Sequence, residues 1–240
     1  MLLMTSPTVT DRLRAARSGD APISPEQRQQ IRELVQALPG PCRTIYPRDI
    51  DGVEGPSGPS LAMLRGALIT QLVRLRSVGL HSTHAVRDAI DALESYDGEG
   101  DLVEFLRHLS ADERARLHAD LSSHSHVLAE RLGHIPDGWR PRAAVRSAAR
   151  VGYLTLRDVN DLVVGTIASG LALVDVTTAE LDERLERRMR YHALVETLRS
   201  GVAPTCVAGL STATGDSAIY PVTVESLHIA VSELPGVSPS

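Results

Sequence analysis

The sequence contains no lysine, so all 25 of its basic residues are arginine. Chemistry that needs an ammonium group or a lysine nucleophile is therefore excluded. Only 3% of the residues are aromatic, which leaves few side chains on which single-stranded bases could stack. The two cysteines, Cys42 and Cys206, are too few and too far apart for a disulfide framework, a zinc knuckle or a four-thiolate iron–sulfur cluster.

Long apolar runs are also missing, because no stretch approaches the roughly 20 apolar residues of a membrane-spanning helix. No basic segment precedes an apolar run near the start, so we expect no signal peptide, no membrane partner and a cytoplasmic location. No Walker-type loop, GxGxxG fingerprint or GxSxG elbow appears, which predicts no nucleotide cofactor. The formal net charge of −5 argues against a nucleic-acid footprint over the whole chain but leaves open a local basic surface.

The first half of the chain has the pattern of a helical region. We expect a flexible arm over residues 1–22 and then a single domain over 23–240, whose part at 23–134 is mainly helical. Ser24 and Gln27 form a capping box, which predicts that a helix begins there.

Three further patterns divide the helical region. Residues 39–60 are rich in proline and glycine and predict a long loop. Leucines at helical spacing from 61 to 75 predict a helix. Ser110 and Glu113 form a second capping box ahead of a long helix.

The second half, residues 135–240, predicts an α/β core. Glycine and proline separate short runs that are rich in valine, isoleucine and leucine, as is typical of strands. We expect strands near 142–149, 152–165, 170–176, 203–211 and 217–222, with helices near 178–200 and 224–233. This order predicts an α/β fold in which helices cover a mixed sheet.

Two acidic residues lie within the predicted strands. Asp161 is in "VNDLVV" and Asp175 is in "LVDVTT". A buried carboxylate is costly unless it is paired or binds a cation, and two carboxylates on adjacent strands could hold Mg²⁺ for chemistry on phosphate esters. The alternative is that both are hydrated and structural, Asp161 at a strand edge and Asp175 at a strand end.

The run from about 151 to 222 is similar to the actinobacterial branch of the PD-(D/E)xK nuclease superfamily, RecB-like proteins with a restriction-endonuclease-like fold. Asp161 matches the acidic residue of the second motif, and "VDVTT" matches the third motif with Asp175 as its carboxylate. The stretch from Arg190 to Pro204 resembles the helix that follows, and "LRGALITQLVRL" resembles the leading helix. The resemblance implies an α-β-β-β-α-β core, a Mg²⁺ site at Asp161 and Asp175, and cleavage of phosphodiester bonds.

The sequence departs from this family at positions that catalysis in the family requires. The motif lysine is Thr177 here, and the metal-binding histidine of the leading helix falls at about Thr70. The family's lysine offsets negative charge on phosphate, a role that threonine cannot fill. Arginine could supply a charge, with Arg190 as the candidate, although it transfers protons poorly. Thr177 or Thr178 with Glu180 also reads as a capping box, which predicts a helix start at this point.

The predicted helix after Asp175 carries the candidate nucleic-acid contacts. The resemblance places Arg187, Arg190, Tyr191 and His192 there as residues that contact nucleic acid. The alternative is a hydrated helix face, because arginines alternate with acidic residues at spacings of three and four.

Histidines are the remaining metal candidates. His81 and His84 form one pair, and His124 and His126 form another. His124 and His126 would point to different faces of a helix, and His81 and His84 could share a face but have no cysteine or carboxylate set nearby that completes a zinc site.

Three hypotheses follow. The first is a catalytically impaired protein of the PD-(D/E)xK fold, a pseudoenzyme with a weak or lost Mg²⁺ site that binds nucleic acid, with duplex DNA the favoured target, or a protein partner. The second is an active Mg²⁺-dependent nuclease in which arginine replaces lysine. The third is a structural or interaction protein that uses its helical half.

Overall fold

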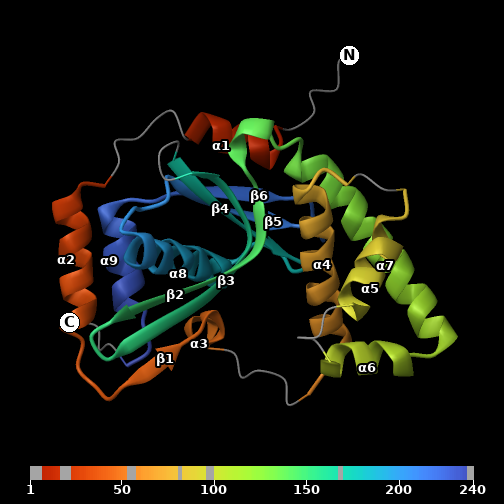
Figure 1. Cartoon of the computed structure of the whole chain (residues 1–240), viewed down its shortest axis with the longest axis horizontal. Coiled ribbons are helices and arrows are strands. Elements are labelled where there is room, and N and C mark those ends of the chain that lie inside the picture. The colour runs from red at the N-terminus through yellow and green to blue at the C-terminus, as the bar shows by residue number, and fades with distance from the viewer. Residues whose placement is uncertain are drawn as a thin grey trace.

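The computed structural model describes residues 7–16, 23–52, 58–80, 83–95, 100–166 and 170–236 as an α/β fold built on one mixed sheet (Figure 1). The strands are β1 (Arg43–Ile45), β2 (Arg142–Val151), β3 (Leu154–Thr166), β4 (Gly170–Thr177), β5 (Cys206–Ser211) and β6 (Ser217–Pro221). The helices are α1 (Val9–Ala16), α2 (Pro25–Gln36), α3 (Pro47–Asp51), α4 (Leu61–Ser77), α5 (Ala85–Glu94), α6 (Gly100–His108), α7 (Ala111–Leu132), α8 (Glu183–Ser200) and α9 (Val224–Ser232), with a 3₁₀ turn at Asp137–Trp139.

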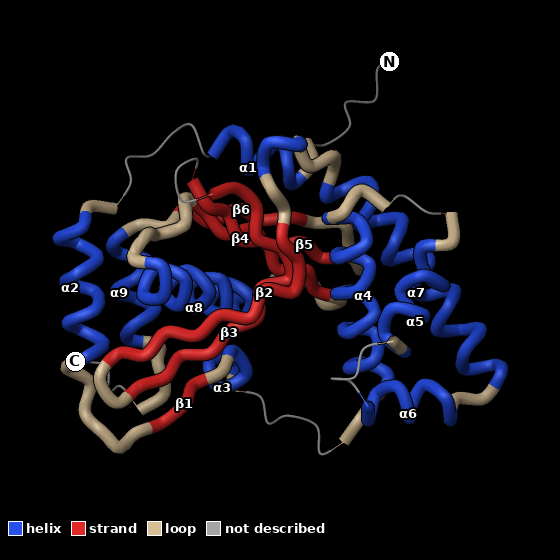
Figure 2. Tube along the Cα trace, in the orientation of Figure 1, coloured by secondary structure: helices blue, strands red, loops and turns tan. Residues whose placement is uncertain are grey.

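β3 organises the sheet. β2 pairs antiparallel with it along one edge, from Leu154 to Val163. Two strands share its other edge: β1 pairs in parallel with residues 154–156, and β4 pairs antiparallel with residues 162–166. β5 then lies parallel to β4, and β6 lies antiparallel to β5. Figure 2 shows β2 and β3 as a long curved ribbon that passes α8.

Two helical layers cover the sheet. α1, α4, α5, α6 and α7 bury one set of leucines and valines against one face, where Leu162, Val174 and Ala208 point. α2, α3, α8 and α9 cover the opposite face, to which Leu173 and Val207 belong. Adjacent strand residues point to opposite faces, so β4 and β5 are apolar on both sides, as a sheet buried between two layers requires.

Several elements are as the sequence predicts. Both capping boxes form, at Ser24 with Gln27 ahead of α2 and at Ser110 with Glu113 ahead of α7. The strands β2, β3 and β4 are followed by α8 and β5 in the predicted order. The α/β fold class with a mixed sheet is therefore confirmed.

Two expectations about irregular segments are wrong. The predicted flexible arm contains α1, whose Val9 and Leu13 are buried in the core, while residues 1–6 and 17–22 lie outside the described residues. The predicted loop at 39–60 contains β1 and α3. β1 is only three residues long and is held by pairing with β3, a distant partner that local periodicity cannot reveal.

The start of α8 also differs from the prediction. Thr177 is still in β4, where it pairs with Ser211, and its hydroxyl accepts a hydrogen bond from the Ala179 N–H at 3.1 Å. The N-cap is Asp182, whose carboxylate accepts from the Leu185 N–H at 2.9 Å. Pairing with β5 thus extends the strand to Thr177, one of the two threonines that were expected to begin the helix.

Candidate functional site

The candidate site lies where β1 and β4 separate along the edge of β3. Residues 157–161 of β3 lie between the segments that pair with β1 and with β4, and no described strand pairs with them on that edge. Backbone groups that are buried without a partner are costly, so side chains must satisfy them. The Tyr191 hydroxyl takes this role at one end, because its single proton lies within reach of the carbonyl oxygens of Ile45 and Arg157, each 2.9 Å from the hydroxyl oxygen.

Asp161 and Asp175 meet in this gap, as the sequence predicts. Asp161 accepts a hydrogen bond from the Thr70 hydroxyl at 3.0 Å and from the Val176 N–H at 2.8 Å. The two carboxyl groups lie close enough for each to shift the pKa of the other. Burial, and then the charge of Asp175, raise the pKa of Asp161 to about 7. Thr70 lies on α4, near the position where the resemblance predicted a metal-binding histidine.

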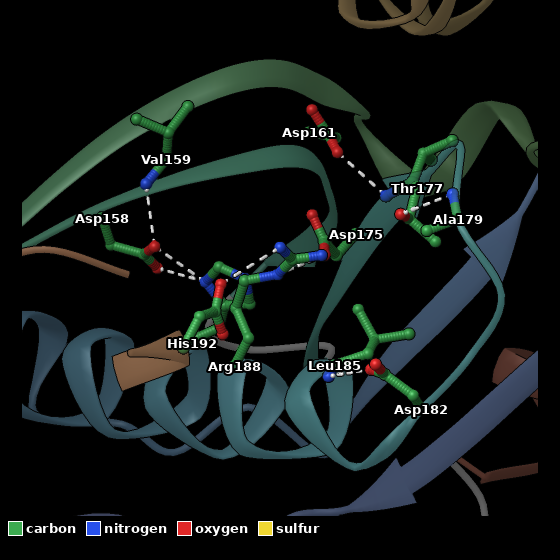
Figure 3. A network of polar contacts seen from close by, with 12 residues as sticks. Asp158, Val159, Asp161, Asp175, Thr177, Ala179, Asp182, Leu185, Arg188 and His192 are labelled. Atoms are coloured by element: carbon green, nitrogen blue, oxygen red, sulfur yellow. Dashed lines mark hydrogen bonds and ion pairs between the residues drawn. The ribbon is translucent and has the colours of Figure 1, made fainter. Parts of the chain in front are cut away.

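Arg188 supplies the positive charge of the gap (Figure 3). Its Nε and Nη2 donate to Asp175 Oδ2 at 3.0 and 2.8 Å, and its Nη1 lies 3.6 Å from Asp51 Oδ2. Burial alone would raise the pKa of Asp175, but the charges of Arg188 and then His192 hold it below its usual value. We call Asp51, Asp161, Asp175 and Arg188 the gap cluster.

Arg190 does not reach the gap cluster, so the expectation that it replaces the missing lysine is wrong. Its guanidinium pairs with Glu233 and Glu186, at 2.6 and 2.5 Å, on the other side of α8. Two residues along a helix turn the side chain by about 200°, whereas the four residues from Arg188 to His192 return it to the same face. Burial raises the pKa of Asp51, and the charges of Arg188 and of the half-buried Arg187 only partly oppose this.

Tyr191 and His192 cannot contact nucleic acid as the resemblance implied, because each is only 1% exposed. His192 Nδ1 lies 2.7 and 2.8 Å from the two oxygens of Asp158, which is also buried. Burial would lower the pKa of His192, but the charge of Asp158 reverses this and raises it. The contact between His192 and Asp158 holds α8 against β3. His192 Nε2 has no hydrogen-bond partner among the described residues.

The position of α8 depends on a small residue in β5. Asp175 pairs with Gly209, and a Cβ at Gly209 would lie 2.9 Å from Leu185 Cδ2. Glycine therefore lets the first turn of α8 approach the sheet closely. One turn later, Arg188 is near enough to bond Asp175.

A resident Mg²⁺ does not fit the side chains as they stand. Mg²⁺ requires oxygen ligands that point at a common centre about 2.0 to 2.1 Å away. Asp175 Oδ2 is bonded twice by Arg188, and both Asp161 oxygens accept hydrogen bonds from the protein. No group of three or more potential metal-ligating side chains occurs among the residues that the structure describes.

The histidine pairs also form no zinc site in the described parts of the chain. His124 and His126 point to separate carboxylates, Asp120 at 3.6 Å and Glu130 at 3.3 Å. His81 lies outside the described residues, and His84 is exposed just ahead of α5.

Sequence reasoning did not identify Asp51, Asp158 and Arg188 as members of this network. Asp51 lies in the stretch expected to be a loop. The spacing of Arg188 and His192 was the available signal, because residues four apart share one helix face.

Comparisons with known proteins leave the family open. No family model matches the chain, and no curated protein matches it. The crystal structure of SSO0001 is similar over 87% of this chain and 84% of that one, with 12% identity and a TM-score of 0.31. None of the described helices is both long and apolar enough to cross a membrane.

Proposed function

We propose that this protein is a non-cleaving relative of the PD-(D/E)xK nucleases that binds duplex DNA. The observation that carries the proposal is the bond between Arg188 and Asp175. The two motif carboxylates come from adjacent strands, as the resemblance to a nuclease site implies, but an arginine bonds the carboxylate that would ligate the metal.

The chemistry of Arg188 explains why cleavage is not expected. A metal ion can lower the pKa of a bound water and so generate a hydroxide nucleophile. A guanidinium holds a fixed charge and stays protonated, so it offers neither a hydroxide nor a general base. The absence of lysine from the chain removes the other group that could orient the water. The gap cluster is better suited to holding the sheet in shape than to hydrolysis.

The hairpin of β2 and β3 offers a surface for DNA. Arg146 and Arg150 on β2 and Arg157 on β3, which we call the hairpin arginines, are exposed and form no ion pair with a described residue. Arg157 lies opposite Ala148, midway between the other two, so all three point to the same side. The exposed residues of these two strands include no Asp or Glu.

The spacing of the hairpin arginines suits a phosphate backbone. Four residues of strand separate Arg146 from Arg150 by roughly 13 Å, close to the width of about 12 Å of the major groove, which admits a two-stranded ribbon. Single-stranded nucleic acid would need stacking side chains, and the chain is poor in aromatic residues. Duplex DNA is therefore the partner that these residues favour.

Binding to a fluorescent DNA duplex, measured by anisotropy at several salt concentrations, tests this proposal. Replacing Arg146, Arg150 and Arg157 together by glutamine should weaken binding and lower the salt slope by about 3, since each lost phosphate contact removes about 0.9. The matched control replaces three exposed arginines elsewhere, Arg107, Arg116 and Arg184, by glutamine.

Three outcomes would contradict the proposal. The first is an equal loss of affinity in the control, which would mean that only net charge matters. The second is cleavage of DNA with Mg²⁺ or Mn²⁺ that Asp175→Asn abolishes, which would establish the active nuclease instead. The third is the absence of any salt-sensitive binding, which would favour an interaction protein.

A further inference from the structure

A second polar site lies in the helical part of the molecule, away from the gap cluster. A cleft of about 430 Å³ is bounded by the second half of α4, the start of α5 and the middle of α7 (Figure 1). None of its lining residues belongs to the gap cluster or to the hairpin arginines. Its size is within the range of sites for small molecules.

The lining of this cleft is basic, and it contains no Asp or Glu among the described residues. It includes Arg76, Arg87, His84, His118 and His126. His126 pairs with Glu130, which does not line the cleft, at 3.3 Å. In a chain with a net charge of −5, a cleft whose ionisable groups are all arginine or histidine selects for an anion.

Arg76 is the residue that points most directly to a ligand. Its Nε is buried without a hydrogen-bond partner among the described residues, and its Nη2 reaches only the Ala129 carbonyl oxygen, at 3.5 Å. Burial lowers the pKa of its guanidinium, because no carboxylate offsets the loss of hydration. Arg188 is also partly buried, but Asp175 and Asp51 surround it. An anion in the cleft would give Arg76 the partner that the fold does not provide.

The other residues that line the cleft indicate which class of anion it binds. The hydroxyl of Ser125 can donate a hydrogen bond and neutral imidazoles donate as well, whereas the Ser122 hydroxyl already donates to the His118 carbonyl oxygen at 2.7 Å. Phosphate oxygens accept several such bonds, and the planar guanidinium matches them in pairs. Leu72, Leu75 and Leu80 form an apolar wall beside these donors. A ligand with a phosphate group on an apolar body satisfies both parts of the lining.

We propose that this cleft binds a small phosphate monoester, with Arg76 and Arg87 as the principal phosphate contacts. This site goes beyond the proposed binding of DNA and does not depend on it.

Isothermal titration of the full chain with phenyl phosphate tests the proposal, with inorganic phosphate and benzoate as comparison probes. Phenyl phosphate should bind saturably and more tightly than inorganic phosphate, because only its ring contacts the apolar wall. It should also bind more tightly than benzoate, whose carboxylate has fewer oxygens to accept hydrogen bonds.

Variants assign the binding to the cleft. Arg76→Gln should weaken phenyl phosphate binding at least about tenfold, since it removes a charge-assisted hydrogen bond, and Arg87→Gln should also weaken it. Arg116→Gln on α7 changes the charge equally but does not line the cleft, and it should bind as the unaltered protein does. Arg87 is exposed, so its variant remains informative even if Arg76→Gln fails to fold.

Four results would overturn the proposal. The first is the absence of saturable phenyl phosphate binding at millimolar concentration, and the second is unchanged binding in both Arg76→Gln and Arg87→Gln. The third is an affinity for benzoate equal to that for phenyl phosphate. The fourth is a loss of DNA affinity in Arg76→Gln. The last would make the cleft part of a nucleic-acid surface. Failure of DNA binding in the unaltered protein would remove the proposed function and leave this site intact.

Discussion

The gap cluster and the helical cleft each contain a partly buried arginine, but among the described residues only the arginine of the gap cluster is paired with carboxylates. In the gap cluster, Arg188 is surrounded by Asp175 and Asp51, and Asp161 completes the group. In the cleft, Arg76 has no carboxylate partner among the described residues. A charge that the fold itself neutralises holds structure together, whereas a charge that the fold leaves uncompensated can be neutralised by a ligand.

The gap cluster also explains how the strand edge is closed. β1 and β4 part along β3, and side chains from α4 and α8 occupy the space in which a strand would pair. Buried polar networks of this kind are costly when incomplete, because each remaining member keeps its desolvation penalty. The cleft lacks this coupling, so its residues can be changed one at a time.

Replacing each of the two arginines by methionine should give the largest difference in stability between the gap cluster and the cleft. Arg188→Met leaves Asp175 and Asp51 partly buried without a counter-charge, so we expect a loss of about 3 to 5 kcal/mol in the free energy of unfolding. Arg76→Met removes a charge that has no partner, so the change should stay under about 1 kcal/mol. Urea denaturation followed by circular dichroism measures both.

A double variant shows whether the loss of stability in Arg188→Met comes from the unpaired carboxylates or from general misfolding. Asp175→Asn combined with Arg188→Met removes both members of the pair and should recover part of the lost stability. Equal losses in Arg188→Met and Arg76→Met would show that the two arginines are not held differently.

Asp161 should give the gap cluster a pH dependence. Its pKa is about 7 in the folded protein against 3.8 for an unperturbed carboxyl, so the folded state holds a proton that the unfolded chain has already released. The stabilising contribution is complete below pH 3.8 and is lost as the pH rises through 7.

Asp161→Asn should remove this dependence. The asparagine oxygen can still accept from the Val176 N–H, and its amide can donate to the Thr70 hydroxyl and to Asp175. At pH 8 we expect the variant to be more stable than the unaltered protein by roughly 4 kcal/mol, and at pH 4 the two should be nearly equal. Urea unfolding from pH 4 to 8 measures the difference, and a constant difference over this range would contradict the prediction.

The sequence could predict those parts of the fold and of the candidate site whose pattern lies in neighbouring residues of the chain. The capping boxes of α2 and α7 and the apolar runs of β3, β4 and β5 are local patterns, and the structure bears them out. The meeting of Asp161 and Asp175 was also predictable, because carboxylates on consecutive strands come close when the strands pair. β1 and α1 were missed because tertiary contacts, rather than periodicity, stabilise such short elements.

The partners of the candidate residues were much harder to predict. Arg188, Arg190 and His192 look alike as members of a charged helix, yet they bond Asp175, Glu233 and Asp158. Which arginine faces the sheet depends on the start of α8, and that start was placed five residues too early, near 178 instead of at Glu183. An error of five residues rotates a helix by about 500°, which is about 140° beyond one full turn, so the sequence alone does not indicate which arginine faces the sheet.

Thr177→Lys should have the smallest effect, and it asks whether a second cation can restore a nuclease site. Thr177 is two residues beyond Asp175 on β4, so its side chain lies on the same face of the sheet. Its hydroxyl accepts one hydrogen bond, from Ala179, at the exposed end of the strand. We expect a change in stability within about 1 kcal/mol and no cleavage of DNA with Mg²⁺, because Arg188 still holds Asp175. Cleavage by Thr177→Lys that Asp175→Asn abolishes would show instead that Asp175 can exchange Arg188 for a metal ion, and the gap cluster would then be a dormant active site.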